Sequence, residues 1–261
     1  MQSLDGLSIP AIMVLFAVIS LVGYELGFRA GRWWQDREPG EQEGPTGIIV
    51  GGLLGLMAFV LAVTMGMATD RFDTRRALVL EDANAIRAAY LQADYLPPAD
   101  AARLQALLRE YAPLRIASDD RVVVEDHVVR SQELQGQMWA IETGAARSGY
   151  SGDLVASLGD SLTELATVAE TRATAALHAR VPETVLWILL FGSALSLVML
   201  GYAAGLTRRR SLLSAAVLIV ALGAVTTLVI DLDRPQDGFL RVSQQPLVDV
   251  VEWMAGPDAS G

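Results

Sequence analysis

The sequence predicts an all-α membrane protein with four transmembrane spans and a helical extramembrane domain inserted between spans 2 and 3. Hydrophobic residues make up 52% of the 261 residues, and they are concentrated in four runs. Each run is long enough to cross a bilayer, which takes about 20 residues of helix. The segment between the second and third runs instead combines charges with a helical period of apolar residues.

Composition argues against several function classes. A formal net charge of −10 argues against nucleic-acid binding, which depends on Lys and Arg that neutralise phosphates. The absence of Cys removes disulfides, thiolate nucleophiles and Cys-ligated metal sites. His127 and His178 show no metal-site spacing, and no nucleotide-binding or hydrolase motif is present. We therefore expect no enzyme activity, no catalytic residue, no metal and no cofactor.

Spans 1 and 2 are expected within residues 1–69, at about residues 9–28 and 47–69. Glu25 lies near the end of span 1, where it is expected to pair with Arg29 at i+4. Span 2 carries no charge, and its small residues recur at spacings of three and four, so they share one helix face: Gly51, Gly55, Ala58, Ala62, Gly66 and Thr69. This face can line a pore or allow another helix to pack closely.

Span 2 is expected to continue as one long helix, because no Gly or Pro interrupts residues 67–96. Pro97-Pro98 then stops the helix. Beyond the membrane its predicted apolar face comprises Val79, Ala83, Ile86, Tyr90 and Ala93. Its remaining polar residues, Glu81, Asp82, Asn84 and Arg87, are interpreted as a solvated surface.

Three arginines follow span 2 directly: Arg71, Arg75 and Arg76. Repeated around a symmetric oligomer, they could concentrate anions at a pore mouth. The alternatives are anchoring to lipid headgroups and pairing with neighbouring acids.

Residues 70–181 form the predicted extramembrane domain, with 17 acidic residues and 12 Arg. After the long helix we expect further helices at about residues 100–117, 119–147 and 154–176, with Asp100 as a possible cap. Spans 3 and 4 follow within residues 182–230, at about 184–206 and 212–230, as a hairpin around Arg208-Arg209-Arg210. Residues 231–261 are expected to form a polar C-terminal segment.

That segment opens with DLDRPQDGFLRVSQQP, a dense polar group at the exit of span 4. Asp231, Asp233 and Asp237 could bind a cation in principle, but caps and ion pairs are the more common use of such acids. We expect the segment to dock against the start of the long helix, with Arg234 near its acids and with Phe239 and Leu240 turned inward.

Two segments resemble the signature segments of the bestrophin-like (DUF4239) membrane protein family. They are VLEDANAIRAAYLQADYLP, residues 79–97, and IDLDRPQDGFLRVSQQPL, residues 230–247. The signature positions are Glu81, Asn84, Asp231, Asp233, Arg234, Pro235, Gly238, Phe239, Arg241, Ser243, Gln244, Gln245 and Pro246. The resemblance covers most of the chain and implies a homo-oligomeric anion channel whose pore is lined by span 2. The acidic calcium-clasp cluster of animal bestrophins has no counterpart here.

Two functional hypotheses follow. The first is a bestrophin-like anion channel in the inner or plasma membrane, a homo-oligomer in the lipid bilayer that passes small inorganic anions. The alternative is a non-conducting scaffold whose acidic helical insert binds a partner protein. Arg residues in the short connections place the insert outside the cell, whereas the family resemblance places it in the cytoplasm.

Overall fold

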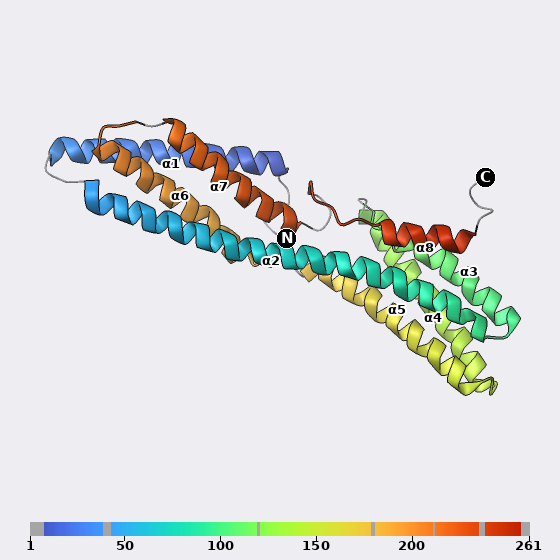
Figure 1. Ribbon diagram of the computed structural model, residues 1–261. Coiled ribbons are helices and arrows are strands. Elements are labelled where there is room, and N and C mark those ends of the chain that lie inside the picture. Colours follow the sequence, from blue (N-terminus) through green and yellow to red (C-terminus); the bar gives the residue numbers. More distant parts are fainter. Residues whose placement is uncertain are drawn as a thin grey trace. The chain divides into compact units, whose positions relative to one another are not determined.

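The computed structural model describes residues 8–38, 43–118, 121–178, 181–210, 212–234 and 238–256. Within these ranges every regular element is a helix, which confirms the all-α class (Figure 1). The elements are α1 (Ile9–Arg37), α2 (Glu43–Gln92), the short 3-10 helix η1 (Ala93–Tyr95), α3 (Pro98–Leu114), α4 (Arg121–Arg147), α5 (Gly152–His178), α6 (Glu183–Leu206), α7 (Leu212–Asp233) and α8 (Gln245–Ala255). The chain divides into two compact units.

The first unit, Met1–Phe72 with Arg180–Leu240, is the membrane unit. The helices long and apolar enough to cross a bilayer are Ile9–Arg37, Pro45–Tyr95, Thr184–Leu206 and Leu212–Asp233. The protein is therefore an integral, multi-pass membrane protein, as the four apolar runs predict. Two of these helices are longer than the predicted spans, since α1 continues to Arg37 and α7 continues to Asp233.

Within the membrane unit, α1 and α6 pack backbone against backbone. A Cβ atom at Gly27 would overlap the carbonyl oxygen of Val198, and one at Gly201 would overlap the carbonyl oxygen of Tyr24. Gly31 and Gly205 extend the same contact. Small residues at spacings of four allow this approach, because membrane helices associate largely through close packing.

Ion pairs join the end of α1 to the turn between α6 and α7. Arg29 donates to Glu25 across 3.0 Å, which confirms the predicted i, i+4 pair. Arg210 donates to the same carboxylate, and Arg208 donates to Asp36. The turn itself places Arg208 at a φ of 53°, so a non-glycine residue adopts the left-handed conformation in this tight connection.

The second unit, Asp73–Ala179 with Arg241–Gly261, is the helical domain. Its core joins the C-terminal part of α2 to α3, α4, α5 and α8. The predicted apolar face of the long helix is confirmed, because Val79, Ala83, Ile86 and Ala93 are buried in this core. Tyr90 packs against the core from a half-buried position.

The C-terminal part of the chain belongs to this domain and is not a uniformly polar segment. α8 buries Leu247, Val250 and Met254 in the core. These residues are three and four positions apart, so a helix brings them to one face. Pro246 suits the first turn of α8, where its missing N–H costs no hydrogen bond.

Helix boundaries differ slightly from the expected ones. α3 begins at Pro98, so Pro97 occupies the N-cap position and Asp100 lies inside the first turn, not at the cap. An acidic residue in the first turn still interacts favourably with the positive end of the helix dipole. Pro113 lies in the last turn of α3, which ends at Leu114. η1 takes the place of the last predicted turn of the long helix.

Candidate ion pathway along α2

The small-residue face of α2 is uncovered in the membrane unit. Gly51, Gly55, Ala58, Ala62 and Gly66 are exposed, and Thr69 is half-buried. A Cβ atom added at any of these three glycines would meet no atom within 4 Å. The other side of the helix supplies the residues that are buried in the unit: Val50, Met57, Leu61, Thr64 and Ala68. These three glycines of α2 therefore do not serve packing within the membrane unit, unlike Gly27 and Gly31 of α1 and Gly201 and Gly205 of α6.

The same helical spacing continues in the part of α2 that belongs to the helical domain. The residues that follow Thr69 at steps of three and four are all exposed: Asp73, Arg76, Leu80, Asn84, Arg87 and Leu91. We call Gly51, Gly55, Ala58, Ala62, Gly66 and Thr69, together with these six, the α2 stripe. Asn84 and Arg87 are exposed, as expected of a solvated surface. Glu81 is also exposed, beside the stripe.

The three arginines after span 2 occupy different positions. Arg75 is buried and Arg71 is half-buried, whereas Arg76 is exposed on the stripe. Among the residues that the structure describes, Arg76 makes no hydrogen bond or ion pair. Arg87 makes no ion pair within the described residues either. It is not one of the three arginines that the sequence predicts as anion contacts. The sequence could have identified Arg87, because it continues the three- and four-residue spacing of the small residues along α2.

Asp82 is not solvated, contrary to the expectation. Its carboxylate is fully buried, and Oδ2 accepts hydrogen bonds from Nε of Arg115 at 3.1 Å and Nη1 of Arg172 at 2.8 Å. The period of α2 places Asp82 beside Val79 and Ala83, on the edge of the apolar face. Helices α3 and α5 cover that edge and supply the counter-charges, which the helical period alone does not reveal.

This buried ionic cluster also holds the C-terminal signature segment. Arg172 donates from Nη1 to the carbonyl oxygen of Arg115 at 2.8 Å and from Nη2 to Oε1 of Gln244 at 2.6 Å. Burial lowers the pKa of the Arg172 guanidinium, and the hydrogen bond to Asp82 opposes that shift. Gln244 immediately precedes α8, so the cluster fixes the start of that helix.

The exit of α7, in the membrane unit, contains the signature residues Asp231, Asp233 and Gly238. Asp231 is buried and accepts hydrogen bonds from the backbone N–H groups of Phe239 at 2.8 Å and Leu240 at 3.0 Å. A Cβ atom at Gly238 would lie 2.5 Å from Oδ1 of Asp231, so only glycine fits there without displacing the carboxylate. Asp233 is also buried and accepts from the backbone N–H of Val181 at 2.6 Å.

The acids at the exit of α7 bind backbone groups. The carboxylates of Asp231 and Asp233 cap backbone N–H groups, as expected of such acids, and Asp237 lies outside the described residues. Among the described residues no group of three or more potential metal ligands occurs. Of the two histidines, His127 is half-buried on α4.

Two expectations about this segment have different outcomes. Phe239 and Leu240 are 76% and 41% exposed and do not turn inward, because Asp231 binds their backbone and leaves their side chains outside. Arg234 is buried, and its contact with the helix after span 2 stays a prediction. Pro235 lies outside the described residues, and Arg241 is exposed.

A groove of about 540 Å³ lies beside the stripe in the helical domain. α2 lines it with Asp73, Arg76, Ala77 and Leu80, and the start of α8 lines it with Ser243, Gln245, Pro246 and Asp249. Ser243 accepts from the backbone N–H of Gln245, whose side chain donates to Asp249 at 2.7 Å. Three signature residues therefore build the wall that faces Arg76.

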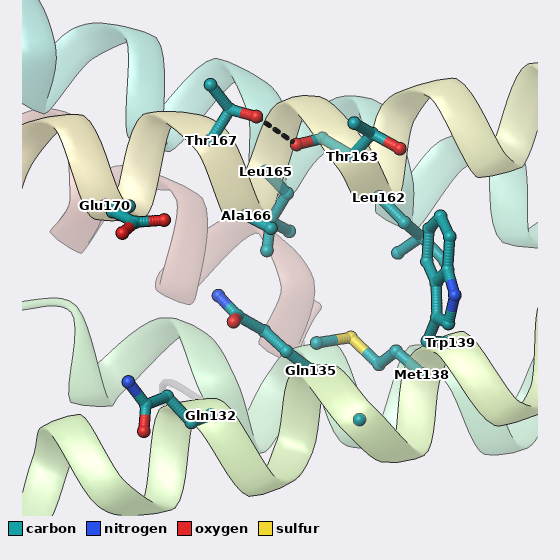
Figure 2. A pocket seen from close by; sticks show the side chains of 11 residues that line it. Gln132, Gln135, Met138, Trp139, Leu162, Thr163, Leu165, Ala166, Thr167 and Glu170 are labelled. Atoms are coloured by element: carbon teal, nitrogen blue, oxygen red, sulfur yellow. Dashed lines mark hydrogen bonds between the residues drawn. The ribbon is translucent and has the colours of Figure 1, made fainter.

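A second groove, of about 470 Å³, lies between α4 and α5 (Figure 2). Its floor includes Met138, Leu165 and Ala166, with Trp139 at one end and Glu170 at the other. Thr167 donates its hydroxyl to the carbonyl oxygen of Thr163, so this wall is an ordinary helix surface. The groove has one charged lining residue among those described, and no part of α2 lines it.

Known proteins with a similar sequence profile or a similar structure share this architecture. The Bestrophin-like domain family profile matches residues 14–247. A bestrophin homologue from Klebsiella pneumoniae is similar in structure: one single-substitution variant is 15% identical, with a TM-score of 0.69 and coverage of 95% of this chain and 95% of that chain. A second variant is 16% identical, with a TM-score of 0.68 and coverage of 94% and 96%.

A crystal structure described as a membrane protein is similar to the same extent. It is 15% identical, has a TM-score of 0.67, and the match covers 94% of this chain and 96% of that chain. At these identities the structures share the fold. No curated protein sequence matches the chain.

Proposed function

The chain belongs to the bestrophin-like family of membrane proteins, and on that basis we propose that it forms an oligomeric anion channel whose pore is lined by α2. The observation that carries the proposal is the uncovered α2 stripe. In the membrane unit the stripe consists of small residues, which are exposed except for the half-buried Thr69, and a Cβ atom added at its glycines would meet no atom within 4 Å. A ring of subunits with this face toward its axis would leave room for hydrated ions.

The physical contrast between the faces of α2 supports this orientation. Large apolar side chains that are exposed on another face of the helix, such as Ile49 and Leu56, suit contact with lipid or with a neighbouring subunit. A face of Gly and Ala exposes little apolar side chain, so hydrating it costs less than hydrating a face of Leu or Ile.

The charges of the stripe favour anions. Beyond the membrane the stripe carries Arg76 and Arg87 against a single acid, Asp73. Neither arginine pairs with a carboxylate within the described residues, so both charges stay available. Repeated around a ring, such groups raise the local concentration of anions. Arg71 and Arg75 remain candidates at the mouth, but their partial or full burial makes Arg76 the stronger one.

The absence of cysteine allows a direct test. Single substitutions Gly55→Cys, Ala58→Cys and Ala62→Cys are introduced on the stripe, and chloride flux from proteoliposomes is measured before and after a charged, membrane-impermeant thiol reagent. We expect modification to change the flux at these positions. Leu56→Cys is the matched control, because Leu56 is exposed on the face of α2 that is assigned to lipid or a neighbouring subunit. A thiol there should not react with the charged reagent, so the flux should stay unchanged.

Selectivity provides the second readout. Arg76→Glu and Arg87→Glu should shift the reversal potential in a salt gradient toward cations. Wild-type proteoliposomes without anion flux would refute the channel. Equal responses at Leu56→Cys and at the stripe positions would refute the assignment of the pore to this face of α2.

The groove between α4 and α5 supports the alternative of a scaffold, because its apolar floor could accept a partner helix (Figure 2). The two functions separate in one preparation. A scaffold should purify as a monomer and carry no ion flux, whereas the proposed channel should purify as a ring-shaped oligomer with α2 innermost.

A further inference from the structure

We infer that Trp253, on the C-terminal helix α8, positions Arg87 on the α2 stripe and thereby sets the anion selectivity of the helical domain. The inference rests on the proposed channel function and deepens it. It assigns a role in selectivity to a residue that does not belong to α2 and lies outside both signature segments.

The contact between the two side chains is direct. The guanidinium carbon of Arg87 lies 4.7 Å from the centroid of the Trp253 ring. Arg87 is exposed, and Trp253 is 38% exposed. A cation over the face of an indole is attracted by the negative charge density of the ring, and Trp is the best aromatic residue for this contact.

The Trp253 ring also packs against a second aromatic ring. Tyr90 of α2 meets it edge to face, with ring centroids 5.3 Å apart and an interplanar angle of 70°. Arg109 of α3 donates to the hydroxyl of Tyr90 and, across 3.0 Å, to the carbonyl oxygen of Met254. Tyr90 on α2 therefore packs on the ring directly, while Arg109 on α3 holds Tyr90 and the backbone of α8, so the ring is a rigid support for Arg87.

An aromatic support differs from an acidic one in its effect on charge. A carboxylate would orient Arg87 but would also neutralise it, whereas the ring orients the guanidinium and leaves its full charge available to anions. The helix itself offers no acid for pairing, because the residues three and four positions from Arg87 are Ala83, Asn84, Tyr90 and Leu91.

Arg76 provides the contrast within the same stripe. Among the described residues no aromatic ring supports it, and it shares its groove with the acids Asp73 and Asp249. Those acids offset its field at short range. Arg87, held without a counter-charge, is therefore the more effective anion-selecting group of the two, and Arg76 serves as the matched control.

The test is a double-mutant cycle read as the chloride-to-potassium permeability ratio, obtained from reversal potentials of the full-length reconstituted protein. Trp253→Leu should lower the ratio toward the value of Arg87→Gln. Trp253→Phe keeps an aromatic face and should retain most of the wild-type ratio. In the double variant, Trp253→Leu should add no further loss to Arg87→Gln, whereas its effect should add to that of Arg76→Gln.

A purely structural role for Trp253 would give a different pattern. It would lower the thermal unfolding midpoint and the total conductance while leaving the permeability ratio unchanged, and Trp253→Leu would add equally to both arginine variants. Either result overturns the inference and leaves the channel in place. An absence of anion flux in the wild type refutes the channel itself and is recorded before any variant is compared.

Discussion

Arg172 and Asp82 form the central ionic contact of the helical domain: Nη1 of Arg172 donates to Oδ2 of Asp82 across 2.8 Å, and the carboxylate is completely buried. The two residues are 90 positions apart in the chain. Since Arg115 donates to the same oxygen, one buried carboxylate serves two guanidinium groups. The contact ties α2 to α5 and, through Gln244, to the start of α8.

Removal of Asp82 should therefore be costly. Asp82→Asn leaves two largely buried arginines without a counter-charge, and breaking a buried pair in this way costs about 3–5 kcal/mol. We expect a large drop in the thermal unfolding midpoint of the detergent-purified protein. The matched control is Glu133→Gln, which removes an exposed partner of Arg130 and should change stability little. Similar losses in both variants would contradict the structural role of the cluster.

The α1–α6 contact predicts opposite responses of glycines in different helices. Gly201→Ala places a Cβ atom against the carbonyl oxygen of Tyr24, so α1 and α6 must separate and the yield of folded protein should fall. Gly51→Ala meets nothing within the subunit and should fold normally. The folding of both variants is measured as the yield and the monodispersity of the detergent-purified protein. A folding defect of Gly51→Ala as severe as that of Gly201→Ala would show that the α2 stripe is packed in the assembled protein and does not line a pore.

A substitution at Gly238 tests how much the hydrogen bonds of Asp231 at the end of α7 contribute to stability. Gly238→Ala pushes a methyl group against the carboxylate of Asp231 and weakens its hydrogen bonds to Phe239 and Leu240. A loss of about 1–3 kcal/mol is expected for such buried groups. Gly136→Ala in α4 is the control, because it meets no atom and should stabilise the helix by about 0.5–1 kcal/mol. Unfolding midpoints that move in the same direction would contradict this account.

Tyr111 should make the stability of the helical domain depend on pH in the alkaline range. Burial raises the pKa of its phenol above the ordinary value of 10.0, so the folded state keeps the proton that the unfolded chain releases. The contribution to stability is therefore complete below pH 10.0 and declines as the pH rises through the higher pKa of the folded state. Ultraviolet absorbance of tyrosinate should show one group that titrates after the others, and Tyr111→Phe should remove that late step. An unchanged titration of Tyr111→Phe would contradict the assignment.

Local pattern alone was sufficient for the four membrane spans and the long helix after span 2, but not for α8, which joins the core of the helical domain. A bilayer crossing requires about 20 apolar residues, so the four runs identify the spans without reference to neighbours. The unbroken sequence after span 2 and the stop at Pro97-Pro98 predict the long helix, because Gly and Pro act on the backbone locally. The small-residue face of α2 was likewise predictable from spacing, whereas the backbone N–H groups that Asp231 and Asp233 bind, at Phe239, Leu240 and Val181, were not.

Tertiary structure decided what these residues do. Asp82 and Arg87 lie on the same helix and look equally polar in the sequence, yet one is buried by α3 and α5 and the other faces solvent beside Trp253. Gly51 and Gly201 are both glycines of apolar helices, yet only Gly201 has another backbone against it. Burial and partnership depend on which distant segments pack together, and helical periodicity describes only one helix at a time.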